Sequence, residues 1–272
     1  MISPKELAHV ADLVRTAAAD ELQTRFRAVA AAKKADGSLI TEADLAMQRR
    51  LHRQLAEYLP RYALLGEEMS AAEQQAMLDS TGEGVWCLDP LDGTANFAAG
   101  IPFFAVSLAL LVEGRTCAAV VYDPVRKECF RALRGHGVWL NSRRLTRPAS
   151  PTELRDCMAM VDLKRLPAAL VIALGGAPPY RSQRSFGSVA LDWCWVASGR
   201  CQLYLHGGQR LWDYAAGRLI LEESGAVGGV LQAYDGDWQD EPTLEPRIAI
   251  AATDTRLLDQ WRGWISAALA GA

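Results

Sequence analysis

The stretch Asp89-Pro90-Leu91-Asp92-Gly93-Thr94 places two carboxylates three residues apart across a turn. Pro90 favours the first corner of such a turn, and Gly93 accepts backbone conformations that a side chain would forbid. Carboxylate oxygens without a neighbouring His or Cys favour Mg²⁺, Mn²⁺ or Ca²⁺ over zinc. If a helix begins near Thr94, its free N–H groups form an anion site beside the metal. The stretch therefore predicts a metal and phosphate site, with an ordinary Asp- and Gly-rich surface turn as the alternative.

The sequence on both sides of this stretch is typical of buried strands. Val85-Trp86-Cys87-Leu88 precedes it, an apolar run over 103–112 follows it, and Gly100-Ile101-Pro102 marks the turn between. A polar turn between two buried strands favours the metal site over the surface turn.

Composition limits the class of protein. With 272 residues, 50% of them hydrophobic, the chain can bury a large core as one domain or two closely packed halves. The balance of 29 basic and 32 acidic residues, net charge -3, makes nucleic acid an unlikely substrate. Six cysteines without a C-x-x-C pair predict core residues in a reducing compartment. Since we find neither a signal peptide nor an apolar run of membrane-spanning length, we expect a soluble, cytoplasmic protein.

Apolar periodicity predicts two helices before the carboxylate turn. A capping box at Ser3 and Glu6 begins a helix over residues 4 to about 31, and a loop is expected over 33–38. Thr41 then caps a second helix that runs through about Tyr58. Asp44 is the third residue of that second helix. The other elements expected are a strand at 63–65, a polar surface segment over 70–84, and strands near 85–89, 103–112, 116–123 and 127–133. This half, residues 1–148, is predicted to be α+β with a mostly antiparallel sheet.

Beyond residue 148 strands and helices alternate, which predicts an α/β half over residues 149–272. The expected strands lie at 157–161, 201–205 and 247–252. The expected helices lie at 167–174, 188–197 and 214–224, the last closed by Gly225, with a final helix from Thr255.

Four separated segments carry the candidate chemistry: Thr41 to Asp44, Gly66 to Glu68, Asp89 to Thr94, and Leu211 to Gly217. Each ends a strand or begins a helix, where catalytic and metal-binding carboxylates gather. Taken singly, Asp44 and Asp213 are explained as helix caps and Glu67 as a solvated acid. Their joint occurrence favours one shared site.

These motifs resemble the inositol monophosphatase family, the magnesium-dependent, lithium-sensitive sugar phosphatases, over about residues 30–250. The central motif is present as Trp86 and Asp89-Pro90-Leu91-Asp92-Gly93-Thr94-Ala95-Asn96-Phe97, and the second signature as Trp212 to Gly217. The segments 187–192 and 196–200 also match family positions. The resemblance implies one domain over 1–272 with a layered α-β-α-β-α sandwich, a metal site where its halves meet, and a homodimer.

The resemblance also implies metal ligands. Glu67, Asp89 and the carbonyl of Leu91 would hold one Mg²⁺, and Asp89, Asp92 and Asp213 a second. A third Mg²⁺ would bind weakly near Glu67, so two to three ions are expected per site. Lithium would replace the second ion.

The implied catalytic residues are Glu67 and Thr94, which orient a metal-activated water, and Asp44, which is hydrogen-bonded to the Thr94 hydroxyl. Two ions can stabilise both oxygens of an in-line displacement at phosphorus, without a covalent phosphoenzyme. Lys33 aligns, without gaps back from Asp44, with a lysine near the metals. The substrate-binding residues implied are Asp92, Gly93, Thr94, Gly187, Ser188, His206 and Asp213.

The chain departs from the family at the substrate end. Inositol-selective members often carry Glu seven residues before the Trp-Asp aspartate, where this chain has His206. His206 is interpreted either as a hydrogen-bond donor to sugar hydroxyls or a second anionic group, or as a loop histidine. Arg184 and Arg210 would add positive charge there. That combination suits a substrate with a carboxylate or a second phosphate.

We therefore predict a Mg²⁺-dependent phosphomonoesterase for a small polyol or sugar phosphate, inositol 1-phosphate being the family default. Histidinol-phosphate phosphatase, or another small phosphomonoester or bisphosphate phosphatase of the superfamily, is the alternative. Ala95-Asn96-Phe97 argues against the adenosine-bisphosphate branch. A hypothesis of another class is a partner-binding or RNA-associated scaffold role beside catalysis, although the net charge gives RNA no electrostatic help.

Overall fold

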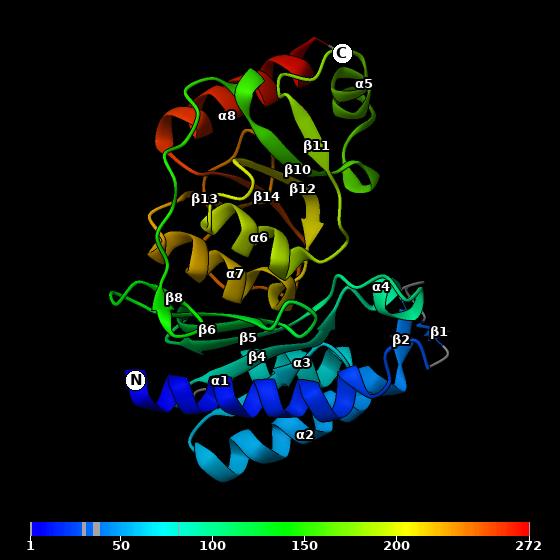
Figure 1. The fold of residues 1–272 in the computed structure, drawn as a ribbon, viewed down its shortest axis with the longest axis vertical. Helices are drawn as coiled ribbons and strands as arrows, with labels where there is room; N and C mark the ends of the chain where they lie inside the picture. The colour runs from blue at the N-terminus through cyan, green and yellow to red at the C-terminus, as the bar shows by residue number, and fades with distance from the viewer. Residues whose placement is uncertain (1, 29–30, 35–38, 81, 272) are drawn as a thin grey trace.

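The computed structural model of the chain describes residues 2–28, 31–34, 39–80 and 82–271. Within these residues, helices and two large sheets alternate in layers (Figure 1). Helices α1 (Pro4–Ala18) and α2 (Glu42–Tyr58) cover one face of a seven-stranded sheet, and α6 (Val189–Ala197) and α7 (Leu211–Glu223) cover the other. A five-stranded sheet follows, and α5 (Ala168–Gly176) and α8 (Thr255–Ala270) form the outer layer. The predicted α-β-α-β-α sandwich is confirmed.

The seven-stranded sheet has the order β3-β4-β5-β6-β7-β8-β9. Its first pair is parallel and every other pair is antiparallel. Strand β4 is buried along its whole length because helices pack on both of its faces. The strands are β3 (Ala63–Gly66), β4 (Val85–Asp92), β5 (Ala105–Val112), β6 (Arg115–Asp123), β7 (Glu128–Leu133), β8 (Val138–Leu140) and β9 (Arg143–Arg144).

The five-stranded sheet has the order β11-β10-β12-β14-β13 and mixes parallel and antiparallel pairs. Helices α6 and α7 lie between the two sheets, so the apolar side chains of both helices face a shared core. The strands are β10 (Met158–Asp162), β11 (Ser182–Arg184), β12 (Leu203–Gln209), β13 (Val227–Leu231) and β14 (Arg247–Ala252). The division near residue 148 falls between the two sheets and stays a prediction.

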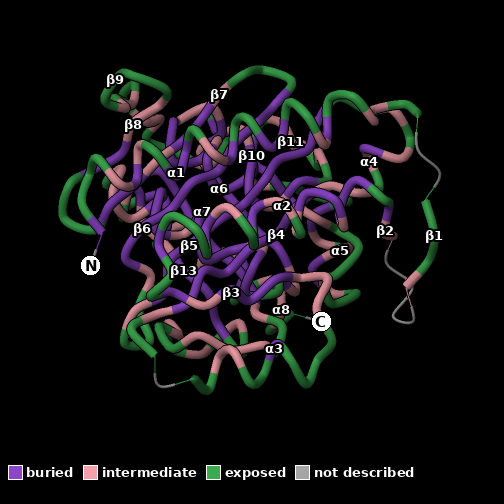
Figure 2. The backbone as a smooth tube through the Cα atoms, turned by 90° about the horizontal axis from the view of Figure 1, so that it is seen from below, coloured by how far each residue is buried: buried purple, intermediate pink, exposed green. Residues whose placement is uncertain are grey.

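Burial follows the layers. Figure 2 shows the buried backbone running through the centre of the molecule, with exposed segments at the rim and the ribbon of β1 (Ala31–Lys33) and β2 (Leu39–Thr41) at one edge. No helix in the described part of the chain is long and apolar enough to cross a membrane.

The structure differs from the expected elements in three places, although the segment 70–84 lies at the surface as predicted. The first helix ends at Ala18, continues as a single π-turn over Ala19–Gln23, and is followed by β1 instead of reaching residue 31. The segment 70–84 is not only a loop, because a capping box between Ser70 and Glu73 starts helix α3 (Ala71–Leu78). Strands β8, β9, β11 and β13 were not predicted, since they are short or glycine-containing. The predicted loop over 33–38 lies mostly outside the described residues.

Close packing between α6 and α7 generates the first prediction. A Cβ added at Gly217 of α7 would lie 2.5 Å from the Cβ of Trp193. We expect Gly217→Ala to lower the free energy of unfolding by about 1–3 kcal/mol, because such overpacking forces the helices apart. Urea denaturation measures this change.

Gly263→Ala in α8 is the matched control. No atom lies within 4 Å of a Cβ added there. Because alanine is a better helix former than glycine, this variant should gain about 0.5–1 kcal/mol. If both substitutions changed the free energy of unfolding equally, the close contact between Gly217 and Trp193 would be contradicted.

Candidate active site

At the end of β4, the regular pairing with β5 is interrupted. Asp89 pairs with Ser107 and Asp92 with Ala105, so the register shifts between the two aspartates. The Oδ1 of Asp89 accepts a hydrogen bond from the N–H of Leu91 at 2.9 Å, which closes the predicted turn. Gly93 follows with a φ of 94°, and a Cβ there would lie 3.1 Å from two backbone carbonyls. Glycine is therefore required where the chain turns from β4 into α4 (Thr94–Ala98).

A cavity of about 530 Å³ opens at this turn, between the two halves of the sandwich. It brings together carboxylates from three of the four segments that the sequence places in one site, those around Glu67, Asp89 and Asp213. The predicted site residues that line it are Glu67, Asp89, Leu91, Asp92, Gly93, Thr94, Gly187, Ser188, His206 and Asp213. Asp44 lies behind Thr94 and does not line the cavity, and neither do Lys33, Arg184 or Arg210.

The start of α6 holds Asp92. Its carboxylate accepts hydrogen bonds from the Ser188 hydroxyl at 2.5 Å and from the N–H groups of Val189 at 3.1 Å and Ala190 at 2.7 Å. The first amides of a helix have no partner within the helix, so they are free to bind this carboxylate. Asp213 is held similarly at the start of α7, where it accepts from the N–H of Arg210 at 2.8 Å. Two helix starts of the second half thus fix carboxylates at the cavity.

Thr94 and Asp44 form a buried pair. The Thr94 hydroxyl lies 3.0 Å from Oδ1 of Asp44 and 2.9 Å from the carbonyl oxygen of Leu91, and its single proton serves one of them at a time. Oδ2 of Asp44 accepts from the N–H and the hydroxyl of Thr41, at 2.8 and 2.5 Å. Burial raises the pKa of Asp44. Asp44 is therefore both the helix cap and the partner of Thr94, two interpretations that the sequence left as alternatives.

The lysine beside Glu67 is Lys34 and not Lys33. The Lys34 ammonium lies 2.8 Å from the Glu67 carboxylate and 2.7 Å from that of Glu68, whereas Lys33 is exposed in β1. Burial raises the pKa of Glu68 to about 7. Burial opposes the charge on Lys34, but the two ion pairs outweigh it and raise its pKa. Counting back from Asp44 without gaps had pointed to Lys33, whereas the lysine that contacts Glu67 is Lys34.

Helix α3, which the sequence did not predict, fixes the end of β3. The side-chain amide of Gln74 donates to the carbonyls of Gly66 at 3.1 Å and Glu67 at 2.9 Å. Glu67 also continues the pairing with β4 through its N–H, which donates to the carbonyl of Leu88 at 3.0 Å. The backbone of Glu67 is therefore held from two sides, and its carboxylate is left to face the cavity.

The cavity carboxylates repel one another. Burial, together with the charges of neighbouring acids, raises the pKa of Asp89 well above its ordinary value, that of Asp92 to about 6 and that of Asp213 to about 8. Within the described residues, no three His, Cys, Asp or Glu side chains are gathered closely enough to hold a metal ion as they stand. Asp89, Asp92 and Asp213 are instead each held by separate N–H or hydroxyl donors. Excess negative charge of this kind, made of oxygen ligands, fits hard divalent cations.

A second polar cluster lies at the far wall of the cavity. Asp162 ends β10 and pairs in register with His206 of β12, so both face the same side of the sheet. The Nδ1 of buried His206 accepts from the N–H of Gly208 at 3.2 Å, so its Nε2 carries the proton and donates to Oδ2 of Asp162 at 3.1 Å. Burial lowers the pKa of His206, which is therefore neutral, and this hydrogen bond lowers the pKa of Asp162.

Sequence reasoning missed several residues at this wall. Lys164 and Arg165 line the cavity, and the Arg165 guanidinium lies 3.7 Å from the Asp162 carboxylate. Arg184 donates to Ser182 within its own strand, so the positive charge expected from it comes from Arg165 instead. Asp192 also lines the cavity, and its buried Oδ1 has no hydrogen-bond partner among the described residues. Only the strand pairing of β10 with β12 brings the 162–165 segment here, and no local motif signals it.

The chain resembles known proteins in sequence and in fold. The profile of the Inositol monophosphatase family matches residues 4–266. The Nus factor SuhB of Pasteurella multocida is 35% identical over 212 residues, which cover 76% of this chain and 75% of the relative. Inositol monophosphatase 1 of Solanum lycopersicum is 36% identical over 207 residues, which cover 71% of this chain and 72% of the relative.

Two solved structures show the likeness in fold. The structure of a Thermotoga maritima IMPase matches with a TM-score of 0.82 at 24% identity, covering 98% of this chain and 99% of that one. An IMPase/NADP phosphatase complexed with Mg²⁺ and phosphate matches with a TM-score of 0.76 at 25% identity, covering 91% of each chain.

The carboxylate charges predict that Mg²⁺ stabilises the protein more at pH 8 than at pH 5. Because the folded-state pKa values of Asp89, Asp92 and Asp213 are raised, the stability that their protons contribute is complete at low pH and is lost as the pH rises toward about 8. A bound cation replaces those protons as the balancing charge. In EDTA the melting temperature should fall between about pH 5 and pH 8, and Mg²⁺ should restore it by several degrees.

Asp213→Asn is the control, because it removes one of the repelling charges without changing the size of the side chain. Its melting temperature in EDTA should depend less on pH, and Mg²⁺ should stabilise it less. A Mg²⁺ effect of the same size at both pH values in the unmodified protein would contradict a cation site made of these carboxylates.

Proposed function

Because the chain belongs to the inositol monophosphatase family, we propose that it is a Mg²⁺-dependent phosphatase that hydrolyses a small polyol or sugar phosphate. The observation that carries this proposal is the convergence of Glu67, Asp89, Asp92 and Asp213 on one cavity. The Mg²⁺ and phosphate bound to the similar IMPase/NADP phosphatase support the choice of metal and of reaction.

The proposed cation ligands are all oxygens. We assign Glu67, Asp89 and the Leu91 carbonyl to one Mg²⁺, and Asp89, Asp92 and Asp213 to a second, with a third near Glu67. When bound, these ions neutralise charge on the phosphoryl group and lower the pKa of water. Burial and mutual repulsion raise the pKa values of Asp89, Asp92 and Asp213, so their charged forms are unfavourable without a balancing charge. A bound cation would supply that charge, and these residues therefore fit a metal site.

The residues of the chain itself position the reactants. We assign to Thr94 the orientation of the attacking water, together with Glu67. Asp44 in turn fixes the Thr94 hydroxyl through the 3.0 Å hydrogen bond, while Thr41 keeps the Asp44 carboxylate from rotating. We expect the backbone N–H groups at Gly93 and Thr94 to bind phosphate oxygens.

We propose that Asp162 takes over the recognition of substrate hydroxyls. Inositol-selective relatives use a glutamate where this chain has His206, and Asp162 is the register partner of His206 on the neighbouring strand. The Asp162 side chain is 23% exposed and lines the cavity, whereas that of His206 is 3% exposed. His206 is thus better placed to orient Asp162 than to bind substrate.

Lys164 and Arg165 suit a second anionic group on the substrate. The Arg165 side chain lines the cavity and is 51% exposed, so it is accessible to a substrate. Histidinol phosphate is the competing candidate, because its cationic end would pair with Asp162 and Asp192. A phosphate-release panel decides between these substrates.

A partner-binding role beside catalysis is a second candidate. The relatives from Pasteurella multocida and Haemophilus influenzae bear the name Nus factor SuhB, which names a factor instead of an enzyme. Copurification of one partner at fixed stoichiometry would support this role. Homodimer formation and lithium inhibition are further expectations from the family, and a cytoplasmic location is an expectation from the sequence.

Asp89→Asn tests the reaction. The substitution keeps the shape of the side chain but removes the charge that both proposed cations share. We expect phosphate release to fall by roughly a thousandfold or more, which corresponds to several kcal/mol of lost transition-state stabilisation. The fold should persist, as circular dichroism can verify. Retained Mg²⁺-dependent turnover in this variant would refute the site.

A panel of inositol 1-phosphate, fructose 1,6-bisphosphate and histidinol phosphate tests the substrate end. Arg165→Ala should raise KM for the bisphosphate about tenfold, because it removes a charge-assisted contact, and leave kcat nearly unchanged. Asp162→Asn should raise KM for inositol 1-phosphate and for histidinol phosphate. If Asp162→Asn changes no KM, the assignment of Asp162 to substrate recognition is wrong.

A further inference from the structure

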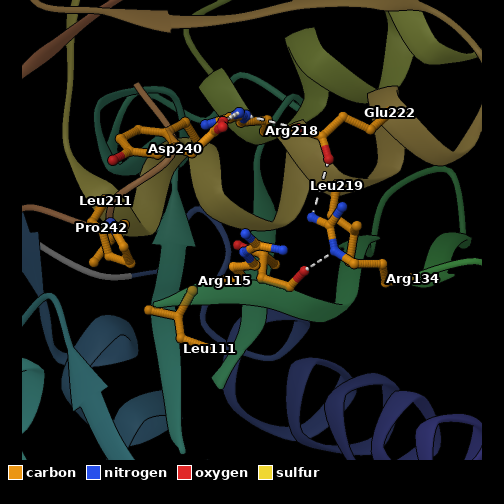
Figure 3. A pocket seen from close by; sticks show the side chains of 11 residues that line it. Leu111, Arg115, Arg134, Leu211, Arg218, Leu219, Glu222, Asp240 and Pro242 are labelled. Atoms are coloured by element: carbon orange, nitrogen blue, oxygen red, sulfur yellow. Dashed lines mark hydrogen bonds and ion pairs between the residues drawn. The ribbon is translucent and has the colours of Figure 1, made fainter. Parts of the chain in front are cut away.

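A second cavity, of about 330 Å³, lies on the other side of α7 from the active site. It opens between the seven-stranded sheet, α7 and the segment that follows β13 (Figure 3). None of its lining residues lines the active-site cavity. The lining residues are Leu111, Arg115, Thr116, Arg134, Leu211, Tyr214, Arg218, Leu219, Glu222, Asp240 and Pro242.

Four of the charged side chains form one alternating network. Arg218 pairs with Asp240 and, at 2.9 Å, with Glu222, and Glu222 also accepts from Arg134 at 3.1 Å. Arg218 donates further to the carbonyl of Gln239 at 2.5 Å. Two positive and two negative charges cancel within this network, so it forms a neutral, ordered wall of the cavity.

The fifth charged side chain, Arg115, leaves the cavity with one positive charge in excess. Among the described residues, the guanidinium of Arg115 has neither a hydrogen-bond nor an ion-pair partner, and the same holds for the hydroxyls of Thr116 and Tyr214. Tyr214 is only 4% exposed. A polar group without a protein partner is free to hydrogen-bond to a ligand or to water. The cavity thus offers a cation and two hydroxyl donors without a matching acceptor.

The remaining wall is apolar. Leu111 of β5, Leu211 and Leu219 of α7, and Pro242 line the cavity beside these donors. Side chains of this kind bury the hydrocarbon part of a ligand and raise its affinity. A cavity of about this volume holds a ligand of metabolite size.

We propose that this cavity is a binding site for a small organic anion, a phosphate or carboxylate attached to an apolar body. Arg115 binds the anionic group, and the hydroxyls of Thr116 and Tyr214 donate hydrogen bonds to it. The apolar body packs against Leu111, Leu219 and Pro242. Tyr214 directly follows Asp213, so the site adjoins the active site through one helical turn but needs none of its carboxylates.

Calorimetric titration of the full chain tests the site, with phenylphosphonate, benzoate and inorganic phosphate as probes. Phenylphosphonate has a carbon–phosphorus bond, so phosphatase activity does not consume it. The titrations are made with Mg²⁺ and again with EDTA. We expect phenylphosphonate or benzoate to bind at least tenfold more tightly than inorganic phosphate, because only these two carry an apolar body. The stronger of the two identifies the anionic group as phosphate-like or carboxylate.

Arg115→Ala should weaken binding at least tenfold, and Tyr214→Phe should weaken it severalfold, while Mg²⁺-dependent phosphatase activity of Arg115→Ala stays unchanged. Arg155→Ala is the matched control, since Arg155 is exposed and lines neither cavity. Binding of the wild-type strength in Arg115→Ala would overturn the proposal. So would loss of binding in Asp89→Asn, which would place the probes in the active site. The absence of any binding up to about 10 mM would overturn it too.

Discussion

The repulsion among buried carboxylates is the constraint on which the arrangement of this molecule depends. Asp89 and Asp92 are almost fully buried, and their pKa values are raised, so the charged forms are costly without a cation. Nearby hydrogen-bond donors offset part of the free-energy cost of these buried charges. Asp92 by itself accepts three hydrogen bonds from residues at the start of α6. Hydrogen bonds thus hold Asp92 in place without an ion, and the cation that we propose would supply the missing positive charge.

The same constraint explains why the two halves of the sandwich meet at this point. β4 carries Asp89 and Asp92 from the first half, and α7 carries Asp213 from the second. Asn96, just after the turn, donates to the carbonyl of Phe103 at 2.8 Å and to that of Phe186 at 2.6 Å, so one side chain joins both halves. A shift between the sheets would therefore separate the carboxylates as well.

Local patterns predicted the turn at 89–94 and the cap at Thr41 correctly, because both are built by residues close in sequence. The expected cap at Asp213 was wrong, since α7 begins at Leu211 and Asp213 is its third residue. Local patterns did not predict the features that depend on pairing between strands far apart in the sequence. The Asp162–His206 contact exists because β10 lies beside β12, and nothing within residues 158–165 signals that neighbour. Lys34 was missed for a simpler reason: an ungapped count cannot resolve a one-residue shift. Helix α3 was missed because its only buried residue is Gln74, so no apolar stripe reveals it.

The two ends of the cavity therefore depend on different features of the sequence. The phosphate end depends on backbone turns and helix starts, which tolerate few substitutions: a side chain at position 93 would meet carbonyl oxygens at 3.1 Å. The substrate end depends on side chains at strand ends, where a carboxylate can pass from one strand to its register partner without moving the backbone. His206 and Asp162 illustrate this, since one strand supplies the orienting donor and the other the acceptor. If Asp162 recognises the substrate as we propose, substrate preference can change at this end of the cavity while the proposed reaction stays the same.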